Sequence, residues 1–119
     1  MNSKQEQIKK FCRERNWDQF HNPKDILLGI VEEVGEFRNL AKWEQDPQVI
    51  RKVFLEKKAE VEDGIGDMFW FLSLLANSYD IDIDQAAQVV IDENERRFPL
   101  DQTKDKHTNI NLGGYDGHH

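Results

Sequence analysis

Apolar positions recur along this chain mainly at the three- and four-residue spacing of amphipathic helices. No segment alternates apolar and polar residues as a half-buried strand does, and no Asn-Gly or Asp-Gly pair joins two apolar runs. The pattern predicts an all-α protein whose four helices cover about residues 3–16, 23–43, 47–78 and 84–97. Because the connections are short, we expect an antiparallel, four-helix bundle-like protomer.

The expected helix ends carry capping residues and prolines. Ser3 followed by Glu6 resembles a capping box, while Asn22 and Asp46 are each followed by a proline at the first helical position. The third helix is long, and Gly64 and Gly66 are the positions where we expect a bend. Residues 1–100 are predicted to form one helical domain, and the polar, glycine-containing residues 101–119 an extended tail.

The second helix combines an apolar stripe with two acidic residues on its flank. Glu33 and Glu36 lie one turn apart and can share a hard cation, with Gly29 leaving room for a substrate or a neighbouring backbone. Two glutamates at this spacing are very common, and taken alone they favour an ordinary solvated helix edge. The predicted core stripe consists of Leu27, Ile30, Val34, Phe37 and Ala41.

The third helix is apolar nearly all round over residues 67–76, which is typical of a buried segment. Asp67, Asp63 and Glu60 share one face, with Asp67 expected between apolar side chains. A salt bridge to another helix or a metal ion opposite Glu33 could balance these charges. Since three stacked acids repel one another, the metal site is favoured, and oxygen ligands suit Mg²⁺ or Mn²⁺.

Other chemistries find less support in the sequence. All four histidines lie outside the predicted helices, and there is no P-loop. Cys12 is on an apolar stripe and is expected in the core. Asn94 and Arg97 share a helical face that could hold a phosphate or simply meet solvent. Residues 17–21 could stack a base or close a loop as a hydrophobic staple.

Composition narrows the class of protein further. The 119 residues suit one domain, and 16 basic against 23 acidic residues give a net charge of −7. This charge argues against nucleic-acid and anionic-membrane partners. A single cysteine excludes an intrachain disulfide and favours a reducing compartment, with the cytoplasm as the expected location. The small size and the apolar segment 67–76 favour self-association.

The order and spacing of several motifs resemble the MazG-like all-α nucleoside triphosphate pyrophosphohydrolases, and most of all their dCTP-pyrophosphatase and integron-associated subgroup. The matching segments are R-N-W-D-Q-F-H at 15–21, P-K-D-I-L at 23–27, E-E-V-G-E at 32–36, Trp43, G-D-M-F-W-F-L at 66–72 and N-E-R-R-F-P at 94–99.

The resemblance implies a metal pattern of E-x-x-E on one helix and E-x-x-D on the next. Glu33, Glu36 and Asp67 match this pattern, but Gly64 stands where the family has a glutamate. Asp63 is the first candidate to replace that glutamate, and Glu60 is the second.

The implied activity is Mg²⁺-dependent hydrolysis of (deoxy)nucleoside triphosphates to the monophosphate and pyrophosphate, in house-cleaning of the nucleotide pool, by a homodimer or a dimer of dimers. Glu32 or Glu36 would orient or deprotonate the attacking water, and Glu33 would take part in catalysis as a metal ligand. The implied substrate-binding residues are His21, Trp43 and Phe71 on the base side, with Lys24, Asn94 and Arg97 for the phosphates, since Val90 replaces a family lysine. The alternatives are a catalytically impaired nucleotide-sensing or protein-binding module on the same fold, and a purely structural helical oligomer.

Overall fold

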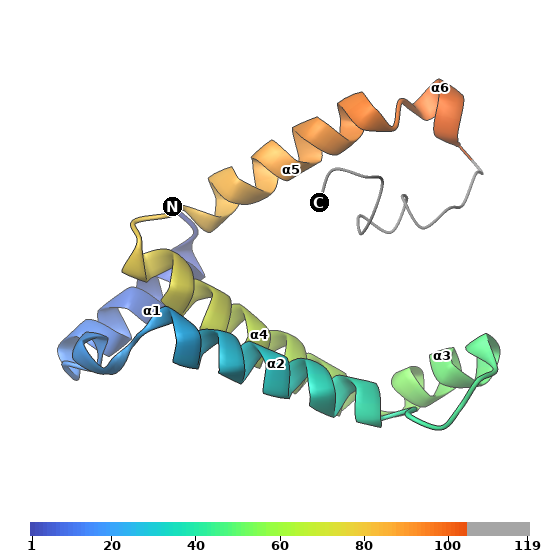
Figure 1. Ribbon diagram of the computed structural model, residues 1–119, viewed down its shortest axis with the longest axis horizontal. Helices are drawn as coiled ribbons and strands as arrows, with labels where there is room; N and C mark the ends of the chain where they lie inside the picture. Colours follow the sequence, from blue (N-terminus) through green and yellow to red (C-terminus); the bar gives the residue numbers. More distant parts are fainter. Residues whose placement is uncertain (105–119) are drawn as a thin grey trace. The chain divides into compact units, whose positions relative to one another are not determined.

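The structure is a computed structural model that describes residues 1–104, and this part of the chain is helical without a strand. The all-α prediction is therefore confirmed for these residues, whereas the four-helix bundle stays a prediction. The elements are α1 (Ser3–Glu14), the 3₁₀-helix η1 (Asp18–Phe20), α2 (Pro23–Asn39), α3 (Pro47–Glu56), α4 (Lys58–Ser78), α5 (Ile83–Arg97) and α6 (Leu100–Thr103) (Figure 1).

The chain divides into two compact units, Met1–Ile83 and Asp84–His119. In the first unit α2 and α4 lie side by side in antiparallel directions, and α1 and α3 both contact α4 (Figure 1). The core forms where α1, α2 and α4 meet. It consists of Cys12, Ile26 and Leu74, with Ile8, Ile30, Trp70, Phe71 and Leu75 packed against them.

Side-chain hydrogen bonds cap the starts of α1, α2 and α3. The Asn22 side chain accepts from the Asp25 amide at 3.0 Å, and the Asp46 side chain accepts from the Gln48 amide at 2.9 Å, as predicted. The prediction that Ser3 caps α1 is wrong, because the side chain of Asn2 accepts the hydrogen bonds at the start of this helix.

A Schellman motif ends α1 and turns the chain into η1. The Trp17 amide donates to the Cys12 carbonyl at 2.9 Å, and the Asn16 amide donates to the Arg13 carbonyl at 3.1 Å. Asn16 has φ 55°, the left-handed conformation that this motif requires. The Trp17 ring packs edge-on against Phe11 at 5.5 Å, which is the hydrophobic contact that accompanies such an ending.

The predicted third helix is two helices, and the break between them lies at Lys57 and not at a glycine. Lys57, with φ −103° and ψ 33°, leaves the helical region and separates α3 from α4, whereas Gly64 and Gly66 lie inside α4. Phe37 of α2 explains the break, since it contacts both sides of it. Its ring lies 6.5 Å from the Phe54 ring of α3 and directly against Gly64 of α4.

The predicted core stripe of α2 is also rotated. Leu27 and Val34 are 48% and 50% exposed, whereas Ile26 is buried. The reason is the close approach of α4 on the side of Gly29, where the Phe71 ring occupies the space that a side chain would need. This contact turns Ile26 inward and leaves Leu27 and Val34 outside.

The α2 helix ends at Asn39, four residues before Trp43, where we expected its end. The Leu40 amide donates to the Phe37 carbonyl, and the Ala41 amide donates to the Arg38 carbonyl. These hydrogen bonds join residues three apart, as in a 3₁₀-helix, and they close the last turn.

The described part of the second unit contains most of α5, and then α6. The predicted tail begins within a short helical turn, Leu100–Thr103, in which the Thr103 and Lys104 amides donate to the Pro99 and Leu100 carbonyls at 3.0 and 3.1 Å. The rest of the predicted tail, residues 105–119, lies outside the described residues, and the predicted domain boundary at residue 100 stays a prediction. Within residues 1–104 no helix is long and apolar enough to cross a membrane.

Candidate active site

Five carboxylates from two antiparallel helices line one pocket of about 320 Å³. Glu33 and Glu36 come from α2, and Glu60, Asp63 and Asp67 come from α4. Phe37, Leu40 and Gly64 complete the wall. The structure thus brings together every residue that the sequence predicted as a metal ligand, including the reserve Glu60.

Helical periodicity explains how each side chain reaches this pocket. Glu33 and Glu36 are three residues apart, while Glu60, Asp63 and Asp67 follow spacings of three and four, so each set shares a helical face. The contact between α2 and α4 then places the two acidic faces around one pocket.

The acidic residues perturb one another. The pKa of Glu33 is raised, first by partial desolvation and then by the negative charges of Glu36, Asp67 and Glu32. Among residues 1–104, no lysine, arginine or histidine forms an ion pair with any of the five pocket carboxylates. The salt bridge considered as an alternative is thus not formed in this part of the chain.

The burial predicted for Asp67 is wrong, because this side chain is exposed to the pocket rather than enclosed by Trp70 and Phe71. Asp63 and Glu60 are exposed as well. Desolvation of buried carboxylates is therefore no argument for a metal here, and mutual repulsion remains the argument.

The donor set fits a hard divalent cation. All five side chains offer oxygen, which Mg²⁺ and Mn²⁺ prefer over nitrogen and sulfur. Within residues 1–104 the five acids do not supply three ligand atoms that all lie within 4.8 Å of one another.

Gly64 packs directly against Phe37 of α2. A Cβ atom at this position would collide with the Phe37 ring, so any larger residue requires that ring to move. The glutamate of the family pattern and this position of Phe37 therefore exclude each other in space. Asp63 and Glu60 both line the pocket and leave the phenylalanine undisturbed.

An aromatic pocket of about 270 Å³ lies between the α1–α2 connection and α4. His21 and Phe71, both predicted on the base side, line it together with Trp17, Phe20 and Trp70. The Phe71 ring also covers Gly29, so the room expected beside this glycine is filled by a side chain of α4. Trp70 was not predicted; its signal in the sequence was a position one residue before Phe71 in the apolar segment.

The remaining predicted residues lie elsewhere. Glu32 and Lys24 are exposed on α2 and line neither pocket. Trp43 is largely exposed beyond the end of α2, with the Lys42 ammonium 5.1 Å from its ring centre.

Asn94 and Arg97 belong to the second unit, which is described by itself. Arg97 forms an ion pair with Glu93 at 3.9 Å and lies over the Phe98 ring. The Asn94 carbonyl accepts a hydrogen bond from the Phe98 amide at 2.8 Å.

The E-x-x-E motif of α2 faces the acidic residues of α4 across one pocket. Comparison with known proteins identifies the class of protein that has this arrangement. The sequence matches the MazG nucleotide pyrophosphohydrolase domain over residues 21–100. The chain belongs to this family, as its motifs indicated.

Individual relatives agree with this assignment. The chain is 34% identical to dCTP pyrophosphatase 1 of Bos taurus and of Mus musculus over 91 residues, which cover 76% of this chain and 54% of each relative. It therefore spans about half the length of the curated relatives it matches. Among solved structures, a pyrophosphatase from Archaeoglobus fulgidus superimposes with a TM-score of 0.70 and 28% identity, covering 79% of this chain and 87% of the other.

Proposed function

We propose that this protein hydrolyses (deoxy)nucleoside triphosphates to the monophosphate and pyrophosphate in the presence of Mg²⁺, as a house-cleaning enzyme of the nucleotide pool. The observation that carries the proposal is the pocket of five carboxylates without a basic partner among residues 1–104, in a member of the MazG family. The relatives named dCTP pyrophosphatase 1 support a deoxynucleotide as substrate.

Glu33, Glu36 and Asp67, with Asp63 or Glu60 in place of the family glutamate, would hold the cation. A bound divalent cation supplies charge neutralisation for the triphosphate and polarises its phosphoryl oxygens. Among the chain's own groups, Glu36 is better located than Glu32 to orient the attacking water and accept its proton, because Glu36 lines the pocket. The base is expected in the aromatic pocket, against Phe71 and His21.

Self-association is part of the proposal. Leu27, Val31 and Val34 follow the spacing of one helical face of α2, and each is about half exposed or more. A second copy covering this stripe would complete a homodimer or a dimer of dimers. It would also supply a phosphate-binding side chain in place of the family lysine, which is Val90 in this chain.

A nucleotide panel tests the reaction. The full chain is incubated with each common dNTP and NTP, with Mg²⁺ or with chelator, and monophosphate plus pyrophosphate is separated from diphosphate plus phosphate by ion exchange. We expect metal-dependent monophosphate and pyrophosphate. Glu33→Gln should lower kcat by at least about 100-fold, as loss of a major electrostatic contact to the transition state does. Glu62→Gln, on α4 outside the pocket, is the matched control and should retain activity.

The second candidate is a nucleotide-sensing or protein-binding module without catalysis, which Gly64 favours because the family glutamate is missing there. It predicts nucleotide binding by calorimetry without product from any nucleotide. Efficient metal-dependent turnover would exclude it. The structural oligomer predicts that Mg²⁺ does not change the melting temperature, so clear stabilisation by Mg²⁺ would count against it.

A further inference from the structure

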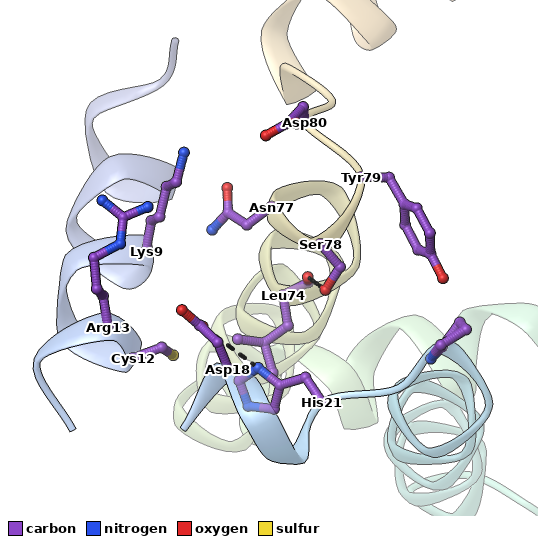
Figure 2. Close-up of a pocket in the computed structure, with 11 residues that line it drawn as sticks. Lys9, Cys12, Arg13, Asp18, His21, Leu74, Asn77, Ser78, Tyr79 and Asp80 are labelled. Atoms are coloured by element: carbon purple, nitrogen blue, oxygen red, sulfur yellow. Dashed lines mark hydrogen bonds and ion pairs between the residues drawn. The ribbon is translucent and has the colours of Figure 1, made fainter. Parts of the chain in front are cut away.

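A second cluster of ligand atoms lies away from the carboxylate pocket, at the junction of α1 and η1. The Cys12 sulfur, a carboxylate oxygen of Asp18 and an imidazole nitrogen of His21 all lie within 4.8 Å of one another. They face a cavity of about 400 Å³ that shares no residue with the carboxylate pocket (Figure 2).

The backbone holds these three residues together locally. The Schellman motif turns the chain back immediately after Cys12, with the Trp17 amide bonded to the Cys12 carbonyl. Asp18 and His21 are three residues apart on a 3₁₀ turn, where side chains at this spacing eclipse. The His21 amide donates to the Asp18 carbonyl at 3.2 Å, and the His21 Nδ1 atom lies 3.9 Å from the Asp18 Oδ1 atom.

We propose that Cys12, Asp18 and His21 form a zinc site. Sulfur, imidazole nitrogen and carboxylate oxygen are the donors of protein-bound zinc, and this mixture is unsuited to Mg²⁺. Three protein ligands leave the fourth tetrahedral position to water or another small ligand from the cavity.

The surroundings allow a cation to enter. The Cys12 sulfur is at the inner end of the cluster, since this residue is only 1% exposed, whereas the Asp18 side chain is 59% exposed and offers the way in. Lys9 and Arg13 also line the cavity, but their side chains extend along α1 away from the sulfur (Figure 2).

Burial, and then the charge of Asp18, raise the pKa of the Cys12 thiol against an opposing effect of Arg15. The metal-free cysteine is therefore a protonated thiol and a poor nucleophile at neutral pH, as expected for a residue of the core. A bound zinc ion would replace that proton, as metals do at thiol ligands.

The test is zinc binding by the full chain, measured by competition with a chromophoric chelator in excess Mg²⁺, which is added to compete with zinc for the carboxylate pocket. His107, His118 and His119 are replaced by glutamine throughout, so that the C-terminal histidines bind no zinc. We expect one zinc ion per chain, and a thiolate-to-metal charge-transfer band after substitution with Co²⁺. Binding without that band would overturn the proposal.

Variants assign the ligands. Removing a hydrogen-bond partner of a metal ligand already costs about 10- to 100-fold in affinity, so loss of a ligand should cost at least about tenfold in Cys12→Ser, Asp18→Asn and His21→Gln. Asp80→Asn, which lines the same cavity outside the cluster, is the control and should bind like the parent. Unchanged affinity in Asp18→Asn would refute the site even if the Cys12 variant failed to fold, because Asp18 is largely exposed and its replacement leaves the core intact.

Discussion

Gly64 and Phe37 share one space between α2 and α4, and this pair shapes the carboxylate pocket. A glycine in the middle of a helix usually weakens it, since glycine loses more backbone entropy than alanine on folding. Here the missing side chain admits an aromatic ring that also touches α3. The glycine at position 64 therefore removes the metal ligand of the family pattern and also makes room for the Phe37 ring.

Gly64→Ala and Gly66→Ala form a matched pair of stability tests. Gly66 has open space around its Cα, so alanine there should stabilise the fold by up to about 1 kcal/mol through helix propensity. At Gly64 the same gain is opposed by displacement of Phe37, and overpacking costs about 1–3 kcal/mol. Urea unfolding should thus find Gly64→Ala less stable than Gly66→Ala; equal stabilities would mean that the ring yields without cost.

Asp63 and Glu60 compete for the role of the missing glutamate. Asp63 is adjacent to Gly64 and four residues before Asp67, whereas Glu60 is one turn further away along α4. We expect Asp63→Asn to lower kcat by at least about 100-fold, as loss of a major electrostatic contact does, and Glu60→Gln to lower it by less than about tenfold. The reverse order in steady-state assays with saturating Mg²⁺ would assign the role to Glu60.

At the scale of elements, one buried polar side chain ties α1 to the end of α4. Gln5 is fully buried, and its Nε2 atom donates to the Asn77 side chain at 2.9 Å and to the Ile81 carbonyl at 2.8 Å. Its Oε1 atom accepts from the Ile83 amide at 3.1 Å. Hydrophobic periodicity gave no signal for this residue, because a buried glutamine looks like a surface one in the sequence.

Replacing Gln5 by leucine should destabilise the fold by about 2–4 kcal/mol, since it leaves several polar partners unsatisfied at about 1–3 kcal/mol each. Gln7→Leu on the exposed side of α1 is the control, and we expect a change within about 0.5 kcal/mol. Thermal and urea unfolding measure both. A Gln5→Leu protein as stable as the Gln7→Leu protein would show that water or rearrangement satisfies the released groups.

At the scale of the whole molecule, the first unit leaves a large apolar area uncovered. The stripe of Leu27, Val31 and Val34 on α2 is 48%, 64% and 50% exposed, and Leu28 beside it is exposed as well. Contiguous apolar patches of this kind usually mark an interface. The rotation of α2 that turned these residues outward therefore agrees with the proposed self-association.

Val31→Glu introduces a charge into the middle of this stripe. It should raise the dissociation constant of the homo-oligomer by at least about tenfold, as disruption of a central interface residue does. Light scattering after size exclusion measures this change. Leu55→Glu, an exposed apolar position on α3 outside the stripe, should leave the assembly unchanged. An oligomer of unaltered mass and affinity in Val31→Glu would place the interface elsewhere.

Features that depend only on residues close in the sequence, such as helix starts and helical faces, could be predicted. Asn22 before Pro23 and Asp46 before Pro47 marked two helix starts, because capping bonds and the fixed φ of proline act within a few residues. The spacing of Glu33 and Glu36, and that of Asp63 and Asp67, likewise put these acids on common faces, since helical periodicity is a local property.

The sequence by itself thus determined the helical class, the family motifs and the set of acids that could hold a metal. Tertiary contact alone decided that α2 turns Ile26 inward, that Lys57 breaks the chain into α3 and α4, and that the two acidic faces surround one pocket. The physical reason is that these outcomes depend on which rings and backbones can approach, above all Phe37 at Gly64 and Phe71 at Gly29, and such contacts join residues that are far apart in the chain.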